Sequence, residues 1–355
     1  MEQSSIEVLE ISFNLDKTTL ITYNRNDIVG WGSFSYNFKG QMTKKQKTSK
    51  VVAIKEIKLR SLIDPYDTLS LQSAMTEINI LKHLKHKNVV KFLGFHQLNN
   101  ERIIIIQKFC NQGDMASFLT KNQFMSQEGV MHFFLQMLNG FKYLIEQKVF
   151  HGDIKPENIF LHNDKVKIGD FGLSVKLKSL TDTFKDPVGS PGFMSPEILN
   201  GEEYTIASDI WALGITLYYM IYEKMPWGDL KNPIKLNKYL KELKEKQGEL
   251  VNFPESWRFP VSSELKTLIK RMIAYDVKER ITWNELFKST GVFLEGGKKN
   301  KKGISPLLYK KIDEKNINKA MENYCSPMLW MDVNEGNVNK IKIWEYTKSQ
   351  YCKGN

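Results

Sequence analysis

The chain has 355 residues, of which 41% are hydrophobic and 12% aromatic, and its formal net charge is +11. This composition can bury a substantial core, so global disorder is excluded, and the length allows one large two-lobed domain or two ordinary ones. Three scattered cysteines without a Cys-x-x-Cys pair disfavour a disulfide scaffold and indicate a reducing compartment. The positive charge alone leaves nucleic acid, membrane surfaces and acidic proteins open as partners, although ordinary soluble enzymes are often basic too.

The N-terminal residues contain no basic segment followed by an apolar one, so we expect no signal peptide. The longest apolar-rich stretch, residues 211–222, is too short to span a bilayer. We therefore expect an intracellular protein of the cytoplasm, with the nucleus as an alternative, and no membrane span.

The elements expected along the chain change in type after its first third. Residues 21–60 alternate short β-like runs with turns, and residues 102–107 form a short β-branched run typical of a buried strand. Residues 71–84 carry apolar side chains at helical spacing, and the pattern of residues 130–138 is helical as well. Strands followed by helices, rather than alternating with them, predict an α+β fold with segregated elements.

The regular pattern weakens after about residue 290, and residues 296–303 are typical of a flexible basic linker. Beyond the linker, the tail has apolar anchors at 307–309 and 328–331, which we expect to pack on the large lobe, to regulate it or to bind a partner. A second small helical module is the alternative. The predicted units are a short N-terminal arm, one large domain, and the linker with its tail: residues 1–20, 21–290 and 291–355.

A glycine-rich turn at residues 29–35 lies between two expected strands. Glycines let backbone N–H groups approach phosphate oxygens, which predicts a phosphate-binding loop, with a plain hairpin as the alternative. Lys55 follows in an apolar strand, where an ammonium needs an anionic partner unless it snorkels to solvent. Glu77 lies at the edge of the apolar face of the predicted helix, so we expect a Lys55–Glu77 ion pair that holds the lysine for phosphate. The loop residues expected at the phosphates are Val29, Gly30, Gly32 and Ser33.

The strongest chemical signal is the segment 151–158, which is followed by an Asp-Phe-Gly turn at 170–172. Phosphoryl transfer needs Mg²⁺, oxygen ligands for that ion, and a group that accepts the hydroxyl proton. The alternative, a polar loop that only caps strands, leaves this combination of groups unexplained. We predict Asp153 as the catalytic base, Lys155 at the transferred phosphate, and Asn158 and Asp170 as ligands of Mg²⁺.

At these residues the chain resembles the eukaryotic protein kinase superfamily, serine/threonine type, over residues 21–290. The resemblance implies a bilobal fold, with a small β-rich N-lobe over about residues 21–109, a larger helical C-lobe over about residues 110–290, and ATP with Mg²⁺ between them. Within the superfamily, the loop sequences resemble those of the calmodulin-dependent and autophagy-initiating groups. The motifs that carry the resemblance are Val-Ala-Ile-Lys at 52–55, His-Gly-Asp for His-Arg-Asp at 151–153, Asp-Phe-Gly at 170–172 and Ser-Pro-Glu for Ala-Pro-Glu at 195–197.

The resemblance also implies contacts that spacing alone does not reveal. Gln107 takes the gatekeeper position, the backbone from Lys108 to Cys110 holds adenine, and Asp114 reaches the ribose. Structural roles fall to Asp209, which anchors the catalytic-loop backbone, and to a Glu197–Arg280 ion pair. The full set of residues implied at the nucleotide is Asn37, Ala53, Lys55, Glu77, Gln107, Lys108, Cys110, Asp114 and Glu157.

Serine/threonine specificity has two supports in the resemblance. Lys155, two residues after the base, is similar to the serine/threonine form, and Ser190 lies in a loop whose hydroxyl contacts base and lysine in the family. Asp114 and Glu157 occupy acidic positions that favour basic side chains upstream of the target. The expected function is ATP-dependent phosphorylation of protein substrates, with a preference for basic residues near the target.

The sequence departs from the family pattern at three positions. Ser35 replaces the third glycine of the phosphate loop, and Asn37 replaces a valine that packs on adenine, which predicts modest nucleotide affinity. Gly152 replaces the arginine that normally receives an activation-loop phosphate. Asp186 stands where many relatives carry the phosphorylated threonine. We therefore predict an enzyme that does not depend on phosphorylation in this loop.

Two rival functions follow from other features. The altered glycine loop favours a pseudokinase scaffold that binds nucleotide without turnover, but the six polar residues expected to bind and transfer phosphate are all present. The net charge and the lysines at 298–302 suggest nucleic-acid binding, but no aromatic residues are interleaved with them, and no nucleic acid is expected. The remaining partner expectation is a regulator bound by the tail.

Overall fold

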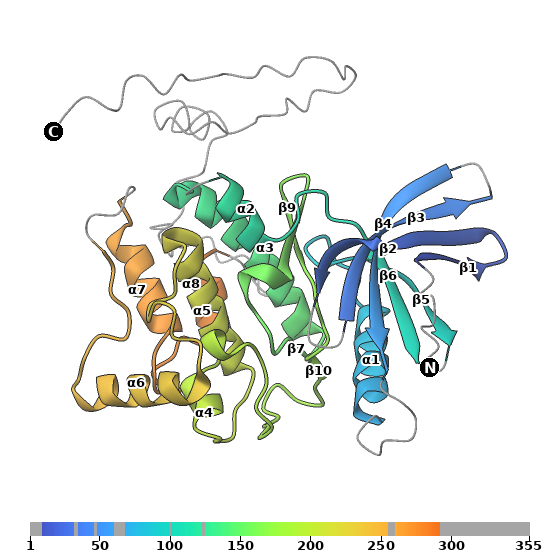
Figure 1. Cartoon of the computed structure of the whole chain (residues 1–355). Helices are drawn as coiled ribbons and strands as arrows, with labels where there is room; N and C mark the ends of the chain where they lie inside the picture. Colours follow the sequence, from blue (N-terminus) through green and yellow to red (C-terminus); the bar gives the residue numbers. More distant parts are fainter. Residues whose placement is uncertain are drawn as a thin grey trace, which may run out of the picture.

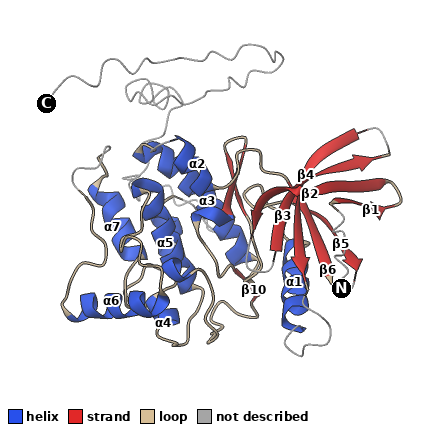
Figure 2. Cartoon of the chain, viewed as in Figure 1, coloured by secondary structure: helices blue, strands red, loops and turns tan. Residues whose placement is uncertain are grey.

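The computed structural model describes residues 9–31, 35–45, 48–59, 68–99, 101–122, 125–254 and 260–291. A β-rich part (the N-lobe, up to Lys108) lies beside a helical part (the C-lobe, from Phe109 onward), as Figure 1 shows. Strands gather in the first part and helices in the second (Figure 2). The predicted α+β fold with segregated elements and two lobes is confirmed.

One antiparallel sheet of six strands forms the N-lobe, in the order β1-β2-β3-β4-β6-β5. The four isoleucines 103–106 in β6 alternate between its two faces and are all at most 2% exposed, because apolar residues cover both sides of the sheet. This burial explains the continuous apolar run in the sequence. The strands are β1 (Glu10–Asp16), β2 (Thr19–Trp31), β3 (Ser35–Lys44), β4 (Thr48–Lys58), β5 (Phe92–Asn99) and β6 (Arg102–Lys108).

The predicted N-terminal arm contains a strand that the sequence analysis missed. β1 pairs with β2 from Glu10↔Asn24 to Asp16↔Thr19 and buries Ile11 and Phe13 against the outer face of the sheet. Its alternation of exposed and buried residues is that of an edge strand with one solvated face. The sheet therefore begins before residue 21.

The helix α1 (Thr68–Leu81) packs on the other face of the sheet, and its buried residues Ala74, Ile78 and Leu81 share a core with Ile57 and Ile105. The predicted helix over 71–84 is confirmed, although it ends at Leu81 and its Leu71 is 37% exposed. Apolar spacing located the helix, but only contact with the sheet decides which side of it is covered.

The C-lobe is built around α5, in which 14 of 16 residues are buried, as expected of a helix that is apolar all round. The predicted apolar stretch 211–222 is the main part of this helix. Within the described residues, no helix is long and apolar enough to cross a membrane. The C-lobe helices are α2 (Met115–Asn122), α3 (Gln127–Glu146), α4 (Pro196–Leu199), α5 (Ala207–Tyr222), α6 (Pro233–Glu245), α7 (Ser263–Met272) and α8 (Trp283–Ser289).

Two short antiparallel strand pairs lie where the C-lobe faces the N-lobe. β8 (Ile159–His162) and β9 (Lys165–Ile168) form a hairpin and are joined by Asn163 and Asp164, both at positive φ, the backbone form of a tight hairpin turn. β7 (Val149–Phe150) pairs with β10 (Val175–Lys176), which follows this hairpin in the chain. The two strand pairs flank the loops 151–158 and 169–174 and hold them side by side.

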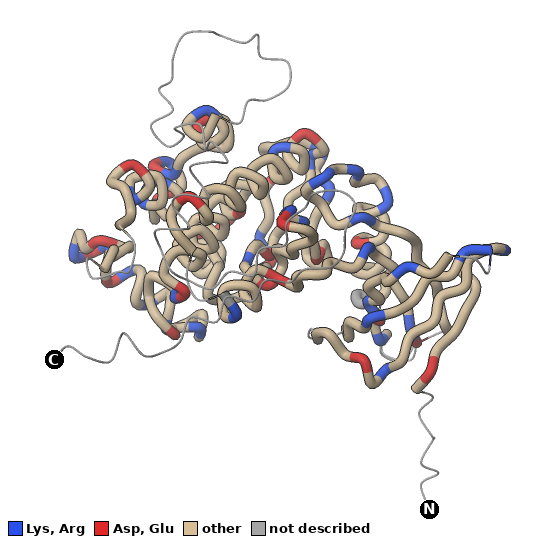
Figure 3. Tube along the Cα trace, turned by 90° about the horizontal axis from the view of Figure 1, so that it is seen from above, with Lys and Arg blue, Asp and Glu red and all other residues tan. Residues whose placement is uncertain are grey.

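Basic and acidic residues are interspersed over both lobes (Figure 3). Among the described residues, the N-lobe has 14 Lys and Arg against 6 Asp and Glu, whereas the C-lobe has 22 of each, so the net positive charge lies on the N-lobe. The predicted linker at 296–303 and the tail after Gly291 lie outside the described residues, as do the loop residues Gly32 and Ser33.

Candidate active site

Three charged side chains from separate elements meet between the lobes. The ammonium of Lys55 in β4 lies 2.8 and 2.9 Å from the two carboxylate oxygens of Glu77 in α1, and 2.7 Å from Oδ1 of Asp170, which follows β9. Glu77 is 2% exposed. The geometry contains the predicted Lys55–Glu77 pair and adds a second carboxylate to it.

The electrostatics of this triad leave an excess of negative charge. Burial lowers the pKa of Lys55, but the carboxylates of Glu77 and Asp170 outweigh it and raise that pKa, so the ammonium stays charged. Burial raises the pKa of Asp170, but Lys55 outweighs it and lowers the pKa to about 2. Burial also raises the pKa of Glu77, which competes for the same ammonium. One cation between two carboxylates leaves a place that an additional cation would stabilise.

The Asp170 side chain is 42% exposed, and its bonds within the described residues all use Oδ1. Its other oxygen is therefore available to a ligand. Among the described residues, no group of three or more His, Cys, Asp and Glu side chains gathers to hold a metal by itself.

A second cluster surrounds the Asp153 carboxylate, which is buried. The backbone N–H and the hydroxyl of Ser190 donate to its Oδ1 at 2.9 and 2.8 Å, and the amide of Asn158 donates to its Oδ2 at 2.9 Å. The Lys155 ammonium lies 2.8 Å from Asp153 Oδ2 and 2.7 Å from the Ser190 oxygen. The Asp153 carboxylate, the Lys155 ammonium and the Ser190 hydroxyl therefore all lie within hydrogen-bonding distance of one another.

The backbone of the segment 151–158 is held by Asp209 of α5. Its two carboxylate oxygens accept the backbone N–H groups of His151 at 2.9 Å and Gly152 at 3.1 Å. Burial raises the pKa of Asp209 to about 7, although both backbone hydrogen bonds oppose that shift. The ring of His151 lies 3.1 Å from the carbonyl of Gly169, which ties this segment to the Asp-Phe-Gly turn.

Gly152 has a backbone that only glycine adopts readily, with φ at 80°. A Cβ added there would lie 2.7 Å from the carbonyl oxygen of Leu173. The sequence analysis missed a matching role for Gly189, which has φ at 103° and would place a Cβ 2.8 Å from the carbonyl oxygen of Gly152. The sequence feature that could have indicated this role is the position of Gly189 directly before Ser190.

The residues expected around adenine and ribose lie on neighbouring elements. Asn37 in β3 is opposite Gly30 in β2 and Lys55 in β4, and Ala53 is opposite Gln107 in β6. The Gln107 amide nitrogen is buried with no acceptor among the described residues, which leaves a donor for a ligand.

The chain continues from Lys108 to Cys110, whose thiol has its pKa raised to about 11 by burial and therefore stays protonated at neutral pH. The Asp114 carboxylate accepts the backbone N–H and the hydroxyl of Ser117, both at 2.8 Å, so it caps α2. Glu157 is exposed, and Val29 is 55% exposed at the end of β2.

The comparisons agree on one family. The sequence pattern of the protein kinase domain matches residues 23–290. The chain is 33% identical over 269 residues to serine/threonine-protein kinase atg1 of Dictyostelium discoideum, covering 73% of this chain and 37% of that protein. It is 30% identical over 278 residues to serine/threonine-protein kinase ULK1 of Homo sapiens, covering 75% of this chain and 25% of that protein. The chain thus spans about a quarter to two fifths of the length of these relatives, and the expected family is confirmed.

Proposed function

This chain belongs to the protein kinase family, and on that premise we propose that it transfers the γ-phosphoryl group of ATP to serine or threonine hydroxyls of protein substrates. The observation that carries the proposal is the Ser190 hydroxyl, held 2.8 Å from Asp153 and 2.7 Å from Lys155. In this proposal the substrate hydroxyl binds at the same carboxylate and ammonium that the Ser190 hydroxyl contacts. The names of the related proteins support the serine/threonine assignment.

In this proposal Asp153 orients the substrate hydroxyl and accepts its proton as the new oxygen–phosphorus bond forms and the bond to the ADP oxygen breaks. Its hydrogen bonds from Asn158 and Ser190 hold the carboxylate in one orientation, so little reorganisation is needed on substrate binding. Lys155 places a positive charge beside the transferred group. These contacts support the roles, and the resemblance had already implied that the Ser190 hydroxyl contacts the base and the lysine.

Lys55 is the proposed partner of the nucleotide phosphates, because the Glu77 carboxylate holds its ammonium at 2.8 Å and keeps it charged. Asp170 and Asn158 are the proposed ligands of Mg²⁺, which when bound would neutralise charge on the phosphates. The excess negative charge at Asp170 supports this assignment. The proposed nucleotide contacts are Val29, Gly30, Asn37, Ala53, Gln107, Lys108, Cys110 and Asp114.

We base the proposed preference for basic residues in the substrate mainly on Glu157. This carboxylate is exposed and lies two residues after Lys155, whereas Asp114 is engaged by Ser117. A positional peptide library should therefore show selection for Arg or Lys that Glu157→Gln weakens. A library without such selection would remove this part of the proposal.

The test of the proposal is transfer of labelled γ-phosphate to a basic protein. Asp153→Asn should lower kcat by on the order of 10²–10⁴-fold, because it removes the proton acceptor, while nucleotide affinity stays within about twofold. The exposed Asp229 supplies a matched Asp→Asn control that should keep full activity. A wild-type chain that binds ATP without transferring phosphate would support the scaffold alternative and overturn the proposal.

A further inference from the structure

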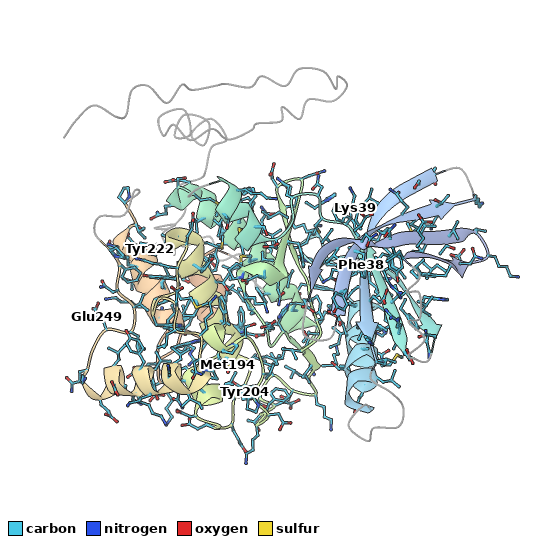
Figure 4. All side chains as sticks on the ribbon, viewed as in Figure 1. Phe38, Lys39, Met194, Tyr204, Tyr222 and Glu249 are labelled. Atoms are coloured by element: carbon cyan, nitrogen blue, oxygen red, sulfur yellow. The ribbon has the colours of Figure 1, made fainter. Side chains whose placement is uncertain are left out.

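Three aromatic rings lie beside the part of the chain that carries Ser190. Phe150, directly before the catalytic segment, stacks on Phe184 with 5.5 Å between centroids and 17° between planes. Tyr204 lies 6.0 Å from Phe150 and 5.6 Å from Phe184. Met194 packs against the same cluster and lies beside Tyr204 near α4 (Figure 4). We refer to Phe150, Phe184 and Tyr204 as the ring cluster.

Backbone hydrogen bonds and close contacts extend from the ring cluster toward Asp153. Phe184 and Tyr204 exchange two backbone hydrogen bonds of 2.9 and 3.0 Å, and the Tyr204 hydroxyl donates to the carbonyl of Asp186 at 2.6 Å. Gly189 then meets the carbonyl of Gly152 at a distance that leaves no room for a side chain. The next residue is Ser190. Residues 184–190, the substrate-side segment, are thus attached at both ends to the catalytic side of the C-lobe.

Around Phe184 charge contributes little to this attachment, whereas at the other end Ser190 is held by hydrogen bonds with the charged groups of Asp153 and Lys155. Gly152 has no side chain that could pair with an anion. Lys185 and Glu203 form an ion pair of 3.4 Å, but their side chains are 72% and 56% exposed. Exposed ion pairs of this kind stabilise proteins weakly. Phe150 and Tyr204, in contrast, are 1% and 3% exposed, so ring packing is the larger contribution.

We infer that Phe150, Phe184 and Tyr204 are positioning residues that hold the substrate-side segment against Asp153 by ring packing, in place of an arginine and a phosphorylated residue. The consequence for activity depends on the proposed function, whereas the anchoring itself does not. Burial raises the pKa of Tyr204 to about 12, which keeps its hydroxyl a donor to Asp186 at ordinary pH. We expect anchorage of this kind to persist without modification of the segment, which the phosphatase test below measures.

The test compares Phe184→Ala with Leu180→Ala in the full chain, because Phe184 is half-buried and Leu180, four residues earlier, is 39% exposed. Loss of the Phe184 ring should speed tryptic cleavage after Lys185 about tenfold and lower kcat/KM for a peptide substrate about tenfold. The KM for ATP should stay unchanged, since the triad at Lys55 is untouched. Leu180→Ala should change neither the cleavage rate nor kcat/KM. Phe184→Tyr, which keeps the ring, should retain wild-type values of both.

Salt and phosphatase treatment separate ring packing from charge. Activity of the wild-type chain should survive complete phosphatase treatment, and cleavage after Lys185 should be equally slow at low and high salt. Unchanged cleavage in Phe184→Ala, or wild-type activity lost to phosphatase, would overturn the inference. If Phe184→Ala unfolds the chain, Phe184→Leu removes the ring but keeps an apolar side chain at this half-buried position; faster cleavage then supports the inference and unchanged cleavage overturns it. Cleavage needs no phosphoryl transfer, so failure of the proposed function would leave this readout intact.

Discussion

Two buried ion pairs in the chain differ in how completely their charges are satisfied. Arg280 binds both oxygens of Glu197 at 2.7 and 2.9 Å, with side chains 0% and 4% exposed, and Ser208 donates a further bond to that carboxylate. Lys55 likewise binds both oxygens of Glu77 but also contacts Asp170, whose side chain is 42% exposed. The first pair is closed and neutral, whereas the second has an exposed carboxylate and excess negative charge. A closed pair has no charge left for a ligand and makes each partner costly to remove, but an open one can receive a ligand.

The largest effect is expected from breaking the closed ion pair between Arg280 and Glu197. Arg280→Met leaves the Glu197 carboxylate buried without its cation, which should lower the free energy of unfolding by about 3–5 kcal/mol. Chemical denaturation measures this loss. The double variant Glu197→Gln with Arg280→Met removes both charges and should recover part of the stability. Equal loss in the single and double variants would show that the charge left behind is not the cause.

Breaking the open pair should reduce activity rather than stability. Lys55→Met removes the ammonium proposed to bind phosphate, so kcat/KM for phosphoryl transfer should fall by on the order of 10²–10³-fold. Steady-state kinetics at saturating peptide measure the loss. The exposed Lys238 supplies a matched Lys→Met control, since it pairs only at 3.9 Å with Glu242 on the surface of α6. A Lys55→Met variant with full activity would contradict the assignment of the phosphate site.

Asp209 extends the comparison to a buried carboxylate that accepts backbone N–H groups instead of pairing with a cation. Its folded pKa of about 7 exceeds the ordinary value of 3.8, so the native state favours the protonated form. The stability that this group contributes is therefore complete below pH 3.8 and is lost as the pH rises through 7. Unfolding temperatures of wild type minus Asp209→Asn should fall from pH 5 to pH 8. A difference that rises with pH would show that the backbone hydrogen bonds outweigh burial.

The smallest expected effect concerns the hydroxyl between Asp153 and Lys155. Ser190→Ala removes a hydrogen bond to each charged group, so kcat/KM for a peptide should fall about tenfold. Ser190→Thr keeps the hydroxyl and should retain most of the activity. Parallel kinetics of the two variants with one peptide distinguish loss of the hydroxyl from a general disturbance of the loop.

Sequence reasoning located the residues that carry chemistry because their spacing on adjacent loops is local. Asp153, Lys155 and Asn158 lie within six positions of one another, and a single loop was enough to predict their meeting. The helix bearing Glu77 was found by periodicity, and its inward edge was inferred from the same pattern. The contact of Lys55 with Asp170 spans 115 positions, and no local pattern could predict it.

The sequence by itself determined which groups are available: strands before helices, the glycine turn, and the carboxylates and lysines of the catalytic segment. Only the tertiary structure decided that β1 adds an edge strand to the sheet, that Asp114 caps α2, and that Phe150, Phe184 and Tyr204 close into one cluster. Local periodicity arises from the geometry of a single element, so it can be read along the chain. Contacts between distant elements depend on which faces are buried together, and those faces exist only once the chain has folded.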